Sequence, residues 1–415
     1  NCSASLFNIE FGRDPNGAGG FTNETKANWL KAYKEFAKAI RERFPYPANT
    51  INLLGPSVVI HGKAEVEITS GASRSWIFDF IDYVVNENLK LSFLTFEVVA
   101  ATPVEAADIA KAVRAYADSK GLKDEDGRPI RLFVTDLRIK EAKLPASLIA
   151  SRSRRSTYYG AFYAATKALW QSTVYGATVG RSARALTLDP AASTPDQVSK
   201  ASQDSDLIWF GTSDPAPGSL KPAAWQSFWF YDGFLGGGGG ALDTCLPGKT
   251  CADVAAEARA KSMILVGQGP DALGVSGTQK SDPVAGLITI ATREKCVSGD
   301  ADTLGAPRDC LTGQDAERFP AVAKGRKNVV RVFVADLNWS VTERETLRHD
   351  LRLQIDGLPK DTETVGYRWA SIDGDDLTWD QHNFPEQGVL DVEDGAFHVR
   401  RTIAVPSMHY FEFLY

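Results

Sequence analysis

The sequence lacks several features that would assign it to common classes of protein. Its 415 residues contain no run of about 18 apolar residues, so we expect no membrane span. There are 46 Lys and Arg against 52 Asp and Glu, and a net charge of −6 argues against nucleic acid or an anionic membrane as partner. The five histidines are scattered, and none lies at metal-ligand spacing from a cysteine pair. We therefore expect no metal and no cofactor.

Cysteines are also few, and their spacing is typical of short local disulfide loops. Cys245 and Cys251 form one close pair and Cys296 and Cys310 a second, which leaves Cys2 over. Three Asn-x-Ser/Thr sequons are present, at Asn1, Asn23 and Asn338. Paired cysteines combined with possible glycosylation sites favour a secreted, extracellular glycoprotein.

The first half of the sequence alternates strand-like and helix-like segments, which is typical of parallel βα units. Apolar runs predict strands at 6–9, 50–57, 89–99, 129–139 and 206–211. Apolar residues at helical spacing predict helices at 29–44, 76–85, 104–121, 157–171 and 221–235. Five such units fit either a doubly wound sheet or most of a (β/α)8 barrel. No Gly-x-Gly-x-x-Gly follows a strand, so a nucleotide-binding fold is the weaker interpretation.

The second half has a different pattern, which begins after the glycine run 236–240. Short alternating strands are predicted at 328–339, 350–359, 364–373 and 408–415, and they indicate a β-sandwich domain over 236–415. The segment 241–315, which holds four of the cysteines, is expected to be loop-rich and stapled by disulfides. In the first half, the charged segment 123–129 is expected to be a solvated turn.

Six segments together resemble the motifs of a known family. They are FNIEFGRDPN, INLLGPS, LSFLTFEVV, LFVTDL, SLKPAAWQSFWFY and YRWASIDGDDLTWDQ. In this order they are similar to the strand, helix and sandwich motifs of glycoside hydrolase family 39, a group of retaining (β/α)8-barrel glycosidases with an appended β-sandwich. The resemblance implies a TIM-type α/β barrel domain over 1–235 that contains barrel strands four to eight, and it implies carbohydrate as the partner.

A chain that begins at the fourth barrel strand lacks three βα units, which would leave open sheet edges. We therefore expect a second chain or a cleaved N-terminal fragment to complete the barrel, with Cys2 as a candidate tether. The resemblance also places Asp14 at the acid/base position and Asp136 at the nucleophile position. A retaining glycosidase needs one protonated and one ionised carboxyl group about 5 Å apart.

The sequence departs from the family at several of these positions. The family has Glu where Asp14 and Asp136 stand, and the shorter Asp side chain moves each carboxyl group back by roughly an ångström. The strand-six His and Tyr positions are matched to Leu94 and Phe96, and the aromatic residue after the nucleophile is Leu137.

Other residues are candidates for the same site. Glu97 is a reserve candidate for a displaced carboxylate, and Glu10 matches a structural glutamate beneath the site. Arg13, which replaces an asparagine of the family, and Trp209 at the end of a predicted strand are candidate substrate-binding residues.

Two functions remain. We favour a catalytically degenerate glycosidase-fold protein, a pseudoenzyme retained for glycan binding or an extracellular structural assembly. The alternative is an active glycosidase with Asp14 as acid/base and Asp136 as nucleophile.

Overall fold

The computed structural model describes two compact units. The described residues are 7–11, 15, 26–46, 51–71, 73–140, 144, 152–173, 177–179, 262–267, 276–277, 287–295, 326, 328–337, 348–373, 386–404 and 406–415. The first unit comprises residues 1–141, 169–182 and 246–252, and the second comprises 142–168, 183–245 and 253–415. The predicted domain boundary at residue 235 lies outside the described residues.

The first unit is built from alternating strands and helices. In chain order they are β1 (Phe7–Glu10), α1 (Lys26–Arg43), β2 (Ile51–Ile60), α2 (Lys63–Glu67), α3 (Trp76–Asn86), β3 (Phe93–Ala100), α4 (Pro103–Ser119), β4 (Arg131–Ile139) and β5 (Ala177–Val179). Helix α6 (Arg152–Thr173) begins in the second unit and ends in the first.

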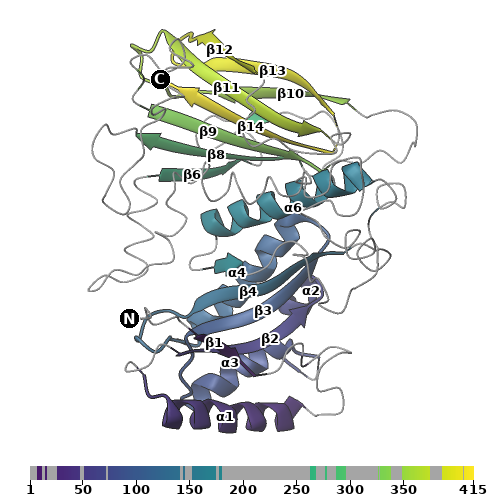
Figure 1. The fold of residues 1–415 in the computed structure, drawn as a ribbon, viewed down its shortest axis with the longest axis vertical. Helices are drawn as coiled ribbons and strands as arrows, with labels where there is room; N and C mark the ends of the chain where they lie inside the picture. Colours follow the sequence, from purple (N-terminus) through teal and green to yellow (C-terminus); the bar gives the residue numbers. More distant parts are fainter. Residues whose placement is uncertain are drawn as a thin grey trace, which may run out of the picture. The chain divides into compact units, whose positions relative to one another are not determined.

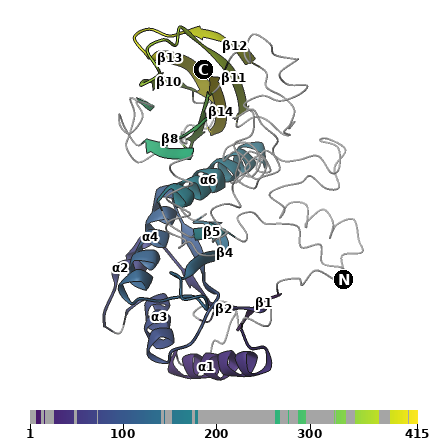
Figure 2. The same ribbon diagram turned by 90° about the vertical axis from the view of Figure 1, so that its left-hand side faces the viewer.

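The five strands of this unit form one parallel sheet in the order β1-β2-β3-β4-β5. Helices α2, α3 and α4 lie on the same side of these strands (Figure 1, Figure 2). The strand order follows the chain without a reversal. A doubly wound sheet has a reversal, so the order of the five described strands is consistent with consecutive strands of a (β/α)8 barrel. The predicted strand 206–211 lies outside the described residues, and the short elements α2 and β5 were not predicted.

Helices α3 and α4 begin within one residue of their predicted starts, whereas α1 begins three residues earlier than predicted. The Thr102 hydroxyl caps α4 by accepting a hydrogen bond from the Glu105 backbone N–H at 3.1 Å, and Pro103 opens the helix. Apolar residues at helical spacing bury one stripe of α3, with Phe78 and Phe80 at 1% exposure. At the end of α6, the Trp170 indole Nε1 donates to the Ala106 carbonyl of α4 at 3.0 Å, which holds this part of α6 in the first unit.

Helix α1 packs against β2 through one tyrosine and one glycine. Tyr33 is fully buried, and its hydroxyl donates to the Leu54 carbonyl at 2.9 Å. A Cβ atom at Gly55 would lie 2.7 Å from Cε2 of the Tyr33 ring, closer than real Cβ contacts. Close packing of the ring on the strand therefore requires glycine at this position.

We expect Gly55→Ala to lower the free energy of unfolding by about 1–3 kcal/mol, because the added methyl group overpacks the site. Urea denaturation of the full chain measures this. In a Tyr33→Leu background the ring is gone, so the same substitution is expected to cost much less. An equal cost in both backgrounds would contradict this account.

The charged segment 123–129 is a turn, as predicted, but it is only partly solvated. Asp124 is 4% exposed, and its carboxylate accepts the backbone N–H groups of Asp126 at 3.0 Å and Arg128 at 2.9 Å. Glu125 accepts a hydrogen bond from the Ser92 hydroxyl at 2.7 Å and pairs with Arg41. The prediction of a turn is therefore confirmed, but full solvation was wrong for Asp124 and Glu125, whose partners composition alone does not reveal.

The second unit is a β-sandwich. Its strands are β6 (Ser262–Gly267), β7 (Ser276–Gly277), β8 (Leu287–Lys295), β9 (Asn328–Asp336), β10 (Arg348–Ile355), β11 (Thr364–Asp373), β12 (Glu386–Asp391), β13 (Phe397–Ala404) and β14 (Ser407–Leu414). They form two antiparallel sheets, in the orders β12-β11-β14-β9-β8-β6 and β13-β10-β7. One apolar core joins both sheets, with side chains that include Val332, Leu353, Val365, Phe397 and Phe411.

The segment 241–315 contains more strand than expected. Strands β6 and β8 lie within it and extend the larger sheet beyond β9. Apart from β7, the rest of the segment lies outside the described residues, so the expectation of a loop-rich segment stays a prediction. The loop-rich segment was predicted from the cysteine spacing alone. The β-branched residues of Leu287–Lys295, which favour a strand paired with β9, were not considered.

A buried ion cluster lies on three neighbouring strands of the larger sheet. Glu412 of β14 accepts hydrogen bonds from Nε of Arg368 in β11 at 2.9 Å and from Nε of Arg331 in β9 at 3.2 Å. The Tyr410 hydroxyl donates to the same carboxylate at 3.1 Å. Burial acts to raise the pKa of Glu412, but the two guanidinium groups outweigh it and the pKa is lowered.

Candidate functional site on the parallel sheet

Two of the carboxylates singled out from the sequence meet at one arginine. Glu97 in β3 and Asp136 in β4 are register partners on adjacent strands. Arg138, two residues further along β4, donates from Nε to Asp136 Oδ2 at 3.1 Å and forms an ion pair with Glu97 through a terminal nitrogen. One guanidinium group therefore bridges two carboxylates that come from different strands.

The three side chains differ in how much solvent reaches them. The Glu97 side chain is fully buried, whereas that of Asp136 is 16% exposed and that of Arg138 is 42% exposed. A ligand approaching this face would therefore meet the guanidinium of Arg138 and the carboxylate of Asp136, with Glu97 below them.

The third carboxylate, Glu10, lies at the end of β1 and is hydrogen-bonded across the sheet. It accepts a hydrogen bond from the hydroxyl of Thr95 in β3. The same hydroxyl oxygen accepts the backbone N–H of Ser57 in β2 at 3.1 Å. Glu10 therefore links β1 to the middle of the sheet.

Two β-bulges lie next to these side chains. The register shifts once between β2 and β3 and once between β3 and β4, which leaves Ser57 and Thr135 as extra residues. Ser57 has a φ of 51°, and its hydroxyl oxygen lies 3.0 Å from that of Thr135.

The bulge in β4 sets which face Asp136 occupies. Leu132 and Val134 are buried with a spacing of two, and burial resumes at Leu137 after a spacing of three. Thr135 and Asp136 therefore both lie on the face opposite these apolar residues. The change of spacing in RLFVTDLRI is a sequence signal for this bulge, which our sequence analysis missed.

Leu94 and Phe96, which stand where the family has His and Tyr, do not lie on the face that carries the candidate site. Leu94 and Phe96 are fully buried and alternate along β3 with Thr95 and Glu97. Alternation places them on the opposite face of the strand from Glu97. They therefore do not line the face that carries Asp136, and the strand-six comparison made from the sequence gives no evidence about this site.

The remaining predicted site residues lie outside the described residues, and their roles stay predictions. They are Asp14, Arg13, Trp209, the cysteines Cys2, Cys245, Cys251, Cys296 and Cys310, and the sequon residues Asn1, Asn23 and Asn338. The predicted disulfides, glycosylation, secretion and barrel-completing fragment also stay predictions. In the described part of the chain, no three His, Cys, Asp or Glu side chains are grouped as a metal site, and no helix could span a membrane.

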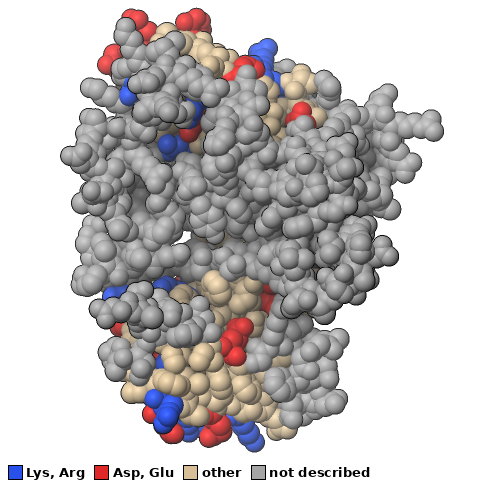
Figure 3. Space-filling view, in the orientation of Figure 1, with Lys and Arg blue, Asp and Glu red and all other residues tan. Residues whose placement is uncertain are grey.

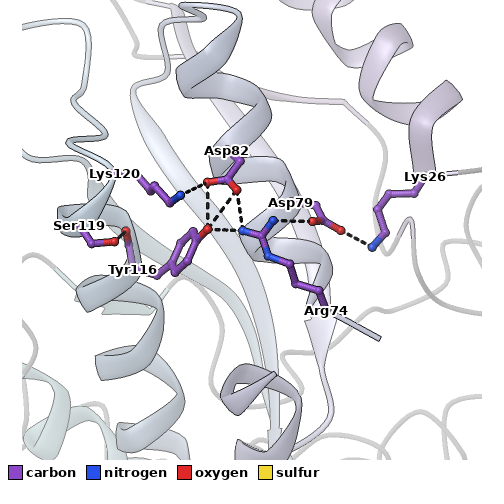
Figure 4. Close-up of polar contacts among 7 residues, drawn as sticks. All are labelled: Lys26, Arg74, Asp79, Asp82, Tyr116, Ser119 and Lys120. Atoms are coloured by element: carbon purple, nitrogen blue, oxygen red, sulfur yellow. Dashed lines mark hydrogen bonds and ion pairs between the residues drawn. The ribbon is translucent and has the colours of Figure 1, made fainter. Parts of the chain in front are cut away.

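A second polar cluster joins the outer helices (Figure 4). Arg74 donates to Asp79 at 3.0 Å and to Asp82 at 2.7 Å, and the Tyr116 hydroxyl donates to Asp82 at 2.9 Å. Lys120 also pairs with Asp82, at 3.1 Å. The cluster ties α3 to α4 through contacts between opposite charges, so we assign it a role in the stability of the fold. Acidic and basic side chains are likewise intermixed at the lower end of the face in Figure 3.

A buried serine and histidine in the sandwich resemble a catalytic dyad, but the proton lies on the wrong nitrogen. The indole N–H of Trp369 donates to Nδ1 of His409 at 3.3 Å. Because an indole nitrogen only donates, Nδ1 is the acceptor and Nε2 carries the proton. Nε2 therefore donates to the Ser407 hydroxyl, 2.9 Å away, and does not accept its proton. Ser407 is also fully buried, so the pair is structural.

Comparison with known proteins yields weak structural similarity. No protein-family model and no curated protein matches the chain in sequence. The chain is similar to a glucosidase from Croceicoccus marinus, with a TM-score of 0.47 and 15% identity over 98% of this chain and 68% of that one. A GH39 enzyme from Xanthomonas axonopodis pv. citri gives 0.43 and 12%, over 98% and 67% of the two chains. A family 51 α-L-arabinofuranosidase from Bifidobacterium longum gives 0.43 and 10%, again over 98% and 67%.

These similar structures are glycoside hydrolases. With TM-scores below 0.5, the similarities establish neither the fold nor an activity of this chain. The strand order and register of the chain itself define its fold.

Proposed function

We propose that this chain is a carbohydrate-binding protein with a glycosidase-like barrel domain, and that it does not hydrolyse glycosides. The observation that carries the proposal is the bridge formed by Arg138 between Glu97 and Asp136. General acid catalysis needs a carboxyl group that holds a proton until the leaving group departs. Two carboxylates that share one permanently charged guanidinium are both suited to the ionised form.

The family resemblance in the sequence supports carbohydrate as the ligand class. Asp136 occupies the position matched to the nucleophile of that family, and its shorter side chain holds the carboxylate back from a bound sugar. The exposed part of the site, a guanidinium beside a carboxylate, offers both donors and acceptors to sugar hydroxyl groups. These groups can bind a sugar without taking part in bond cleavage.

An active retaining glycosidase is the second candidate, and one observation favours it. Asp136 is partly exposed and lies 3.1 Å from the Nε atom of Arg138. A retaining mechanism needs one ionised carboxylate as nucleophile, and this pairing suits that state. The required acid/base would be Asp14, which lies outside the described residues.

Turnover of aryl glycosides separates the two candidates. We expect the full chain to release no more 4-nitrophenol from a panel of 4-nitrophenyl glycosides than the Asp136→Asn variant does. Asp391→Asn, at an exposed position in the sandwich, is the control for loss of a carboxylate. Turnover that survives Asp391→Asn and disappears with Asp136→Asn would show that the protein is an active glycosidase.

A further inference from the structure

Three hydroxyl side chains form a row across β2, β3 and β4, just before the level of Asp136. Ser57 and Thr135 contact each other through their hydroxyl oxygens at 3.0 Å, and the hydroxyl of Thr95 accepts the backbone N–H of Ser57 at 3.1 Å. Thr135 also donates to the Phe96 carbonyl at 3.4 Å. The row therefore connects Ser57, the extra residue of β2, to Thr135, the extra residue of β4, across the strand β3 that lies between them.

Strand pairing alone does not require these extra residues. On β4, Val134 pairs with Phe96 and Asp136 pairs with Glu97, so the ladder passes over Thr135. An extra residue disrupts the ladder locally and bends the strand, and bulges are common where a side chain must be re-aimed. In β4 the bulge places two successive residues, Thr135 and Asp136, on the same face.

We propose that Thr135 is a positioning residue for Asp136. Its hydroxyl, held by Ser57 and by the Phe96 carbonyl, fixes the shape of the bulge, and this shape directs the Asp136 carboxylate toward Arg138. Ser57 has the matching role from β2. The inference uses the proposed function only in taking Asp136 and Arg138 as part of the binding site.

The test measures the coupling between Asp136 and Arg138 in the full chain. A double-mutant cycle with Asp136→Asn and Arg138→Met in urea unfolding gives this coupling without any carbohydrate. We expect it to fall by at least half when the cycle is repeated in a Thr135→Val background, because valine keeps the shape but removes the hydroxyl. Thr135→Ser, which keeps the hydroxyl, is expected to restore the coupling.

A purely structural role for Thr135 predicts a different result. Thr135→Val would then lower the stability of the protein while the coupling stayed as in the wild type, and this outcome would overturn the proposal. If Thr135→Val does not fold, Ser57→Ala removes the hydrogen bond between the two hydroxyl groups instead. The coupling between Asp136 and Arg138 is then measured in that background, and the same two outcomes support or overturn the proposal. Because no ligand is involved, failure of this inference is distinguishable from failure of the carbohydrate proposal.

Discussion

Replacing Glu412 by glutamine is expected to lower the free energy of unfolding by about 3–5 kcal/mol. Glu412 is 4% exposed and is the carboxylate that Arg331 and Arg368 share. Its removal leaves two buried guanidinium groups without this partner, and the desolvation of those charges is no longer offset. Urea denaturation of the full chain, followed by near-ultraviolet circular dichroism, measures the change.

Glu386→Gln is the matched control for this substitution. Glu386 lies in the same sandwich and also pairs with an arginine, Arg401, but its side chain is 38% exposed. Exposed ion pairs contribute about 0–1 kcal/mol, so the control is expected to change stability by no more than that. Similar losses for both variants would contradict the importance assigned to burial of the Glu412 cluster.

Mild acid is expected to destabilise the sandwich through His409. Burial lowers the pKa of His409 from 6.5 to about 3. The folded state therefore binds fewer protons than the unfolded state between these values. The resulting stability is fully present above pH 6.5 and is lost as the pH falls toward 3. The loss amounts to about 3 kcal/mol at pH 4.5 and about 4 kcal/mol at pH 3, where half of the folded molecules carry the proton.

The hydrogen bonds of His409 show why the charged form is disfavoured. Protonation would place a hydrogen on Nδ1, which faces the indole N–H of Trp369 at 3.3 Å. His409→Gln cannot take up this proton, so its stability is expected to fall less than that of the wild type between pH 7.5 and 4.5. His398→Gln, at an exposed position in β13, is the control and is expected to retain the full acid sensitivity. Equal acid sensitivity of His409→Gln and wild type would contradict the assignment.

Much of the first unit could be predicted from the sequence because local signals agree with the fold. The apolar runs of β2, β3 and β4 and the helical spacing of α3 and α4 identified these elements. Shorter or more polar strands, in both units, were not predicted. Strand β5 has three residues, and β12 alternates buried and exposed positions with the weakly apolar sequence EQGVLD. Such strands depend on pairing with neighbours, which periodicity does not encode.

The candidate site could be predicted only in part. Glu97 and Asp136 were both selected from the sequence, but their meeting at Arg138 depends on the register between β3 and β4. That register includes a bulge, and one extra residue reverses the face of every following side chain. Leu94 was matched to a family position of this site, although alternation along β3 already places it on the face opposite Glu97.

Carbohydrate binding at Arg138 is the most direct test of the central claim. The measurement is calorimetric titration of the full chain with a panel of soluble polysaccharides, for wild type, Arg138→Gln and Arg128→Gln. Arg128 lies in the turn before β4 and pairs with Asp126 at 3.8 Å, so it serves as the control. The account predicts saturable binding of at least one polysaccharide, weakened at least tenfold by Arg138→Gln and unchanged by Arg128→Gln. Absence of binding across the panel, or binding that Arg138→Gln leaves unchanged, would contradict it.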